Sequence, residues 1–169
     1  MNNNYPKPMV AMHWVTFLLV LLVYFTSGNP MKTGIVGQIH VLGGILVFIL
    51  FLIRVVLVFI YKDNIPKNSV INKYQTILFK IVKITLYLSL CCVPIFGWLA
   101  LSSLTDSFSA WSINIPLWTE VRGDHFIAEL HQILANVFIT LVGLHACAAL
   151  IHHFVFKDAT LKSMLLKKK

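Results

Sequence analysis

Apolar residues fill four long stretches of the chain, and short polar segments separate them. The stretches run over residues 10–26, 36–61, 79–101 and 126–156. Each comes close to or exceeds the roughly 20 apolar residues that a helix needs to cross a bilayer. The pattern therefore predicts an all-α integral membrane protein, a four-helix bundle that forms one domain over residues 1–169.

The first stretch is short and lies near the N-terminus, so a cleaved signal peptide is the alternative interpretation. It contains His13 and Trp14, however, and no small-residue cleavage site follows Phe25. We therefore expect this stretch to be a retained membrane span.

Composition supports a membrane protein, since 58% of the residues are hydrophobic and only 12% are charged. The formal net charge of +8 could indicate nucleic acid, but its distribution favours a topology signal instead. The basic residues on one side of the spans are Lys7, Lys62, Lys67, Lys73, Lys80, Lys83, Lys157, Lys162 and Lys167–Lys169. The opposite side has only Lys32 and Arg122. This bias predicts an inner-membrane protein with both termini in the cytoplasm, and no nucleic-acid partner.

Outside the last two turns of the fourth stretch, the apolar stretches contain four histidines, His13, His40, His131 and His145. A polar ring at such a position is costly and indicates a functional site. His131 and His145 are fourteen residues apart, which is nearly four helical turns and about 21 Å. The predicted topology places His13 and His145 near the cytoplasmic surface, and His40 and His131 near the outer surface. The histidines should therefore form two pairs between helices, while the third span, which has no histidine, should act as a wall.

Two imidazoles on opposite sides of one iron are the axial ligands of a b-type haem. The chain has no C-x-x-C-H motif, so covalent haem attachment is excluded. Small residues near the histidines, including Gly43, Gly44 and Gly143, would allow close approach of a helix or a cofactor. Phe138, seven residues from both His131 and His145, should lie between the two sites. For any one histidine alone, the simpler alternative is a polar residue hydrogen-bonded between helices.

Two further residues are candidates for a site near the inner pair. Arg54 follows His40 by fourteen residues, so it projects from the same helix face at the depth of the inner pair. A haem propionate or a quinone oxygen would serve as its partner, whereas the alternative is that Arg54 extends to the interface. His152 lies seven residues after His145, where a proton-exchanging imidazole could serve a quinone.

The motifs together resemble the bacterial di-haem cytochrome b561 family over nearly the whole chain. They are M-H-W at Met12–Trp14, Q-I-H-V-L-G-G at Gln38–Gly44, H-Q-I-L-A-N from His131 and G-L-H-A-C-A-A-L-I-H-H-F at Gly143–Phe154. The resemblance implies two non-covalent haem b groups with His13, His40, His131 and His145 as axial ligands. It also implies superoxide oxidation at the outer haem and ubiquinone reduction near the inner one. Lys32 and Arg122 are the candidates to steer superoxide, although the outer loops are net acidic.

Two alternatives remain at this point. The chain could be a cytochrome b anchor subunit that relays electrons from a partner dehydrogenase or hydrogenase to quinone, although its short outer loops favour a protein that acts alone. It could also be a haem-free transporter whose histidines relay protons or bind a transition metal. The sequence does not determine the oligomeric state or the electron donor.

Overall fold

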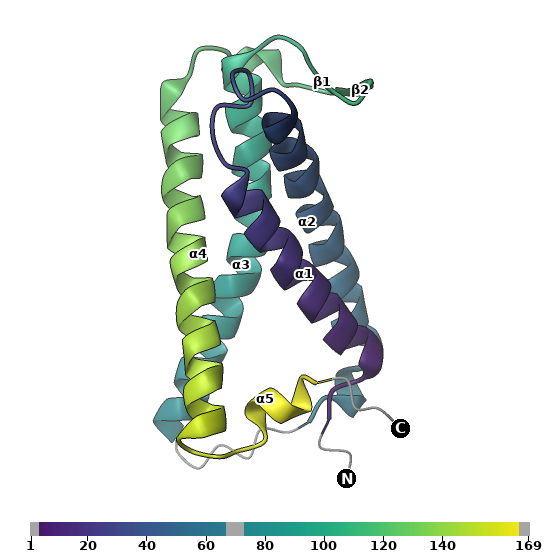
Figure 1. Ribbon diagram of the computed structural model, residues 1–169, viewed down its shortest axis with the longest axis vertical. Coiled ribbons are helices and arrows are strands. Elements are labelled where there is room, and N and C mark those ends of the chain that lie inside the picture. The colour runs from purple at the N-terminus through teal and green to yellow at the C-terminus, as the bar shows by residue number, and fades with distance from the viewer. Residues whose placement is uncertain (1–3, 67–72, 166–169) are drawn as a thin grey trace.

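Four long helices form the body of the protein, as the sequence predicts (Figure 1). The structure is a computed structural model that describes residues 4–66 and 73–165. The helices are α1 (Lys7–Phe25), α2 (Ile35–Ile60), α3 (Lys73–Leu104) and α4 (His125–Phe154). Each is long and apolar enough to cross a membrane. Many of their large apolar side chains are exposed, as expected for helices that present an outer surface to lipid.

The helix bounds differ most from the prediction in α3. This helix begins at Lys73 and ends at Leu104, whereas the apolar stretch covers only residues 79–101. Hydropathy detects the apolar part of a helix and misses polar turns that continue it, such as the one that contains Lys73 and Tyr74. The predicted basic positions Lys67 and Lys167–Lys169 lie outside the described residues.

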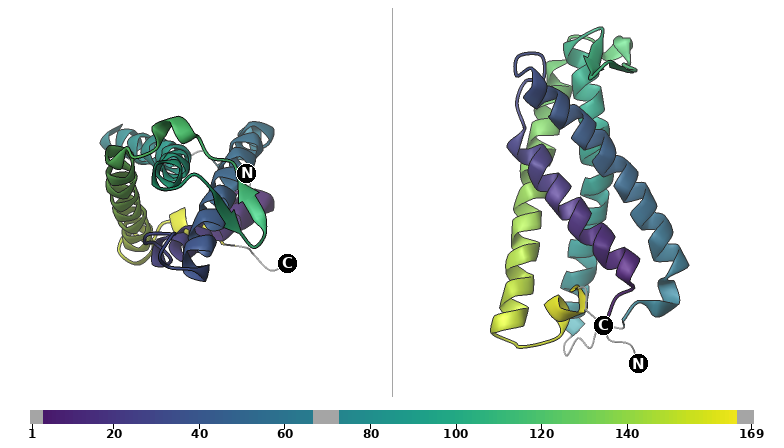
Figure 2. Two further views of the ribbon diagram at one scale, coloured as in Figure 1. Left: turned by 90° about the horizontal axis from the view of Figure 1, so that it is seen from above. Right: turned by 45° about the vertical axis from the view of Figure 1, so that its right-hand side comes forward.

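α1 packs against α2, α2 against α3, and α3 against α4. Figure 2 shows the four helices from above and from the side. One buried apolar residue from each long helix contributes to a core at mid-height, formed by Val20, Val47, Leu90 and Phe138. The sequence placed Phe138 between the two histidine positions of α4, and the structure buries it in this core.

Short elements that the sequence did not predict lie at the two ends of the bundle. At one end, which we call the hairpin end, β1 (Phe108–Ala110) and β2 (Ile113–Ile115) form an antiparallel hairpin. Its two-residue turn consists of Trp111 and Ser112, both with positive φ (45° and 67°). Such turns usually contain Asn or Gly, so the pattern of residues gave no hairpin signal.

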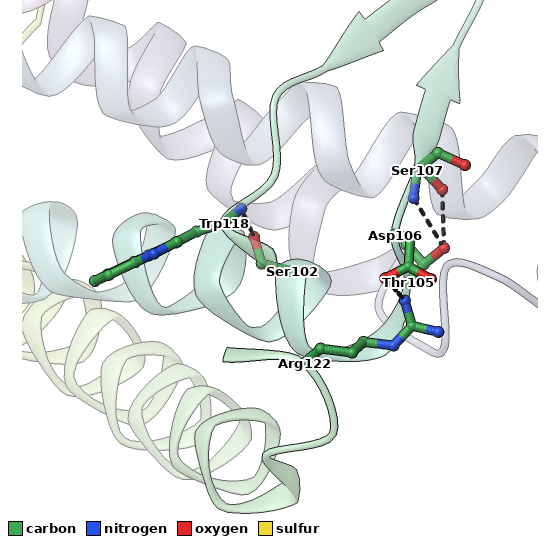
Figure 3. A network of polar contacts seen from close by, with 6 residues as sticks. All are labelled: Ser102, Thr105, Asp106, Ser107, Trp118 and Arg122. Carbon is green, nitrogen blue, oxygen red and sulfur yellow. Dashed lines mark hydrogen bonds and ion pairs between the residues drawn. The ribbon is translucent and has the colours of Figure 1, made fainter. Parts of the chain in front are cut away.

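The hairpin end is tied together by polar contacts, which Figure 3 shows. Arg122 forms an ion pair with Asp106. The backbone N–H of Trp118 donates to Oγ of Ser102 at 3.1 Å. The hairpin is also fixed to α2, because the backbone N–H of Trp111 donates to Oε1 of Gln38 at 3.1 Å. A short 3-10 helix, η2 (Thr119–Val121), leads from this region toward α4.

At the opposite end, the short helix α5 (Thr160–Ser163) crosses from the end of α4 toward the start of α1 (Figure 1). The indole N–H of Trp14 donates to the carbonyl of Met164 at 2.8 Å. The backbone N–H of Tyr5 donates to the carbonyl of Ser163 at 3.2 Å. We call this the α5 end; a 3-10 turn, η1 (Lys62–Asn64), also lies after α2.

Candidate functional site

The residues through which the helices face one another recur every seven positions, which produces two polar layers around the apolar core. On α4 the repeat is His131, Phe138 and His145, and the other helices follow the same spacing. On α1 it is His13 and Val20, and on α2 it is His40, Val47 and Arg54. Seven residues are nearly two turns, so each of these sets lies on one helix face. The core residues therefore separate a layer at the hairpin end from a layer at the α5 end.

The hairpin-end layer contains His40 and His131, whose ring centroids are 6.3 Å apart. Nδ1 of His40 lies 2.9 Å from the carbonyl oxygen of Val23 on α1. Nδ1 of His131 lies 3.1 Å from the carbonyl oxygen of Val93 on α3. A carbonyl only accepts, so each Nδ1 must carry the proton and donate. This tautomer leaves Nε2 of both rings with a free lone pair, as a metal ligand requires.

Close helix packing brings His40 to the carbonyl of Val23. Val23 lies in the last turn of α1, where carbonyls lack a backbone N–H partner four residues on, and its carbonyl also accepts from the Thr26 hydroxyl at 3.1 Å. One turn after His40 on α2, Gly43 allows this contact: a Cβ on Gly43 would lie 2.6 Å from Cγ2 of Val23. Gly43 was expected to allow a close approach, and here it admits α1. No atom lies within 4 Å of a Cβ built on Gly44 or Gly143, among the residues described.

A second glycine makes room for the other histidine of this layer. A Cβ on Gly97 of α3 would lie 2.9 Å from Cε1 of His131. Gly97 is one turn after Val93, whose carbonyl accepts the hydrogen bond from the same imidazole. The expectation that α3 would serve only as a wall was therefore wrong, because this helix both receives and orients His131.

The α5-end layer contains His13 and His145, whose ring centroids are 6.4 Å apart. Here a guanidinium takes the place that carbonyls have in the other layer. NH1 and NH2 of Arg54 both lie 3.4 Å from Nδ1 of His13. Nε of Arg54 donates to the hydroxyl of Tyr87 at 3.0 Å, and the guanidinium carbon lies 5.5 Å from the centre of the Tyr87 ring. Arg54 therefore faces the bundle interior and does not extend to the interface.

Tyr5 closes this layer from the α5 end, outside the membrane spans. Burial raises the pKa of Tyr5 above its ordinary value, and the nearby Tyr87 adds to this effect. Arg54 acts in the opposite direction and lowers it. The net effect is an increase, so the Tyr5 phenol stays neutral beside Arg54.

The two pairs fit a metal held between two imidazoles. With each nitrogen roughly 2 Å from the metal, as in other histidine sites, the ring centres would lie about 6 Å apart. The observed separations of 6.3 Å and 6.4 Å agree with this arrangement. Within the described part of the chain, no group of three or more His, Cys, Asp or Glu residues could hold a metal ion. Two nitrogen ligands per site suit a haem iron, whose porphyrin supplies the other four.

His152 lies in a different environment from Arg54. Its Nδ1 is 2.5 Å from a carboxylate oxygen of Asp158, and the rings of Phe79 and Phe156 lie beside it. Desolvation acts to raise the pKa of Asp158, but hydrogen bonds from His152 and Thr160 outweigh it and lower this pKa. Among the described residues we find no contact between His152 and Arg54, so the structure does not unite the two quinone candidates in one cluster.

The two candidates for superoxide steering also differ. Lys32 lies in the exposed loop between α1 and α2 at the hairpin end. Arg122 is half-exposed and paired with Asp106, which offsets its charge (Figure 3). The pairing leaves Lys32 as the less compensated cation of the two.

Comparison with known proteins places this arrangement in a family. The prokaryotic cytochrome b561 family matches residues 4–167. The chain belongs to this family. It is similar to cytochrome b561 homolog 1 of Escherichia coli, with 26% identity over 99% of both chains. It also resembles the probable superoxide oxidase CybB of Yersinia pestis (27% identity, 100% of this chain and 99% of the relative) and cytochrome b562 of Cereibacter sphaeroides (26%, 96% and 95%).

Membership makes this chain a multi-pass bacterial membrane protein for electron transfer that binds b-type haem. It favours the haem hypotheses over a haem-free transporter. Sequence reasoning missed the residues that position the histidines and Arg54: Val23, Val93, Gly97 and Tyr87. On α3, Tyr87 and Gly97 lie at helical spacings on either side of the core residue Leu90, and this spacing was the available signal for their roles. Without a histidine on the same helix, the signal is weak.

Proposed function

We propose that the protein carries electrons across the inner membrane through two haem b groups, from superoxide at the hairpin end to ubiquinone. His40 and His131 would hold the haem at the hairpin end, and His13 and His145 the haem at the α5 end. Haem b, when bound, supplies a one-electron carrier at each pair. The excess of Lys residues at the α5 end supports a cytoplasmic position for this end, with the hairpin in the periplasm.

The observation that carries the proposal is the presence of two imidazole pairs with nearly equal separations at opposite ends of one core. The fourteen-residue spacing of His131 and His145 sets about 21 Å between the two sites along α4. Among the described residues, one buried apolar layer, which includes Phe138, lies between them. This arrangement suits transfer along the bundle axis better than chemistry at a single centre.

The proposed overall reaction oxidises two superoxide anions to two O2 and reduces one ubiquinone, with two protons, to ubiquinol. The name of the Yersinia pestis relative, probable superoxide oxidase, supports this donor. Lys32 would attract the anion, with a smaller contribution from the paired Arg122. His152, with Asp158 as its partner, is the better placed candidate to supply protons to quinone, because it lies near the α5 end and beside aromatic rings.

The second candidate function is that of a membrane subunit that takes electrons from a partner dehydrogenase or hydrogenase. The hairpin supports this alternative, since Trp111 and Ile113 are exposed at 58% and 57%. A periplasmic redox subunit could cover them. Purification in a detergent that preserves subunit contacts would then recover a second redox chain in equal amounts.

Stopped-flow spectroscopy of the purified haem-loaded protein tests the main proposal. Superoxide should reduce the haem during the time course that the stopped-flow instrument records, and superoxide dismutase should abolish this reduction. Ubiquinone added afterwards should reoxidise the haem. If the haem is intact but superoxide does not reduce it, the superoxide assignment is wrong and the partner-subunit function is favoured. Purified protein without a Soret band would contradict both.

A further inference from the structure

We propose that Arg54, held in place by Tyr87, gives the α5-end haem the higher reduction potential of the two. Electron transfer from the hairpin end to the α5 end would then be downhill. This inference rests on the proposed assignment of one haem to each histidine pair. It assigns Arg54 to the tuning of a haem and leaves His152 as the quinone candidate.

The first argument is the charge of Arg54. Its two terminal nitrogens lie 3.4 Å from Nδ1 of His13. Within the described ranges, no carboxylate contacts its guanidinium. An arginine is always protonated in proteins, so a positive charge faces the ligand of one iron. Such a charge disfavours the ferric state, which carries one more positive charge than the ferrous state, and so raises the potential.

The second argument is that the position of Arg54 is fixed. The Nε donates to the Tyr87 hydroxyl at 3.0 Å, and the guanidinium lies over the Tyr87 ring. Tyr87 in turn contacts Phe51 edge to face, with ring centroids 6.4 Å apart. When Nε2 of His13 holds the iron, its Nδ1 carries a proton and cannot accept from Arg54. The tyrosine then provides the hydrogen bond that keeps the cation in the layer.

The third argument is the opposite setting of the other pair. Both imidazoles at the hairpin end donate their Nδ1–H to carbonyl oxygens, those of Val23 and Val93. A hydrogen bond of this kind makes the imidazole a stronger electron donor to its metal. Stronger donation stabilises the ferric state and lowers the potential. The same type of ligand pair is therefore shifted in opposite directions at the two ends.

Potentiometric titration of the haem-loaded protein, followed at the haem α band, tests this inference. The unaltered protein should show two waves. In Arg54→Gln, the higher wave should fall by at least about 59 mV, which is a tenfold change in the equilibrium for one electron. Tyr87→Phe should produce a smaller shift in the same direction. Arg122→Gln, the same substitution at the ion pair with Asp106, should leave both waves in place.

A His131→Ala background identifies the wave, because it should retain only the α5-end haem. The single remaining wave should be the higher one, and adding Arg54→Gln should lower it. If Arg54→Gln loses haem, Arg54→Lys decides the question: it keeps the charge and should keep the higher wave above the hairpin-end wave, whereas a collapse of the two waves into one in Arg54→Lys with full haem content would overturn the inference. An unchanged or raised potential in Arg54→Gln with full haem content overturns the inference. A single haem in the unaltered protein would instead contradict the proposed function.

Discussion

The two histidine layers use the same ligand pair in different surroundings. At the hairpin end, the imidazoles of His40 and His131 donate to backbone carbonyls of α1 and α3. At the α5 end, His13 faces the guanidinium of Arg54. The position of a backbone carbonyl next to an imidazole depends on how closely the helices pack, whereas the position of a guanidinium depends on one side chain. The surroundings of the hairpin-end histidines are therefore determined by helix packing, and those of the α5-end histidines by the charge of one side chain.

The largest expected effect comes from the histidines themselves. His13→Ala and His145→Ala should each reduce the haem content from two to one and leave the same residual spectrum. His40→Ala and His131→Ala should also leave one haem, but the other one. Haem content per chain and low-temperature α-band spectra measure this. Identical residual spectra for His13→Ala and His40→Ala would show that the layers do not correspond to separate haems.

Gly97 allows a test of the hairpin-end layer through packing alone. Gly97→Ala should place a methyl group against the His131 ring, where a Cβ would lie 2.9 Å from Cε1. Overpacking of this kind costs about 1–3 kcal/mol, unless the ring moves away from the Val93 carbonyl. We expect a lower thermal stability and a change in the spectrum of the hairpin-end haem only.

Leu88→Ala on the same helix is the control for this substitution, because Leu88 is 59% exposed. It should leave both haem spectra unchanged. Equal effects of Gly97→Ala and Leu88→Ala on the hairpin-end haem would mean that the close contact at His131 does not determine the hairpin-end site.

The sequence predicted the four spans and the pairs of histidines that the structure brings together. The spans follow from the length of the apolar stretches, and the pairs follow from a repeat of seven residues. Both patterns can be recognised in the sequence without knowledge of the tertiary structure. The role of Val93 was not predictable, because every residue has a carbonyl and only the position of His131 selects this one. Tyr87 on the third span was missed for a similar reason, since its role is to bind Arg54, which lies on another helix.

The small elements were missed because their sequences lack the usual signals. Trp111 and Ser112 form a turn with positive φ at both positions, where Asn and Gly are preferred. The helix α5 has only four residues, too few for a periodic pattern. Its position depends on contacts with residues about 150 positions earlier, such as the hydrogen bond from Trp14.

That hydrogen bond gives a smaller test at the α5 end. Trp14→Phe removes the donor to the Met164 carbonyl and should reduce stability by about 1 kcal/mol. It should also expose the α5-end haem, so that a water-soluble reductant reacts faster with it than with the haem at the hairpin end. Trp118→Phe is the matched control, because its indole N–H donates to the exposed Glu120 at the other end. Equal rates for the two haems in Trp14→Phe would show that α5 does not protect its layer.

The smallest effect should come from Asp158, which pairs with His152 near the α5 end. A carboxyl whose pKa is lowered in the folded state adds stability above its ordinary pKa of 3.8, and this contribution is lost as the pH falls through the lowered value. Because the Asp158 side chain is 38% exposed, Asp158→Asn should cost no more than about 1 kcal/mol at neutral pH. Thermal melts of the variant and the unaltered protein should therefore differ slightly at pH 7 and converge below pH 3.8. A difference that grows as the pH falls would contradict this sign. Among the described residues, neither His152 nor Asp158 contacts a histidine of either layer or Arg54, so both haem potentials should stay unchanged, which separates this effect from that of Arg54.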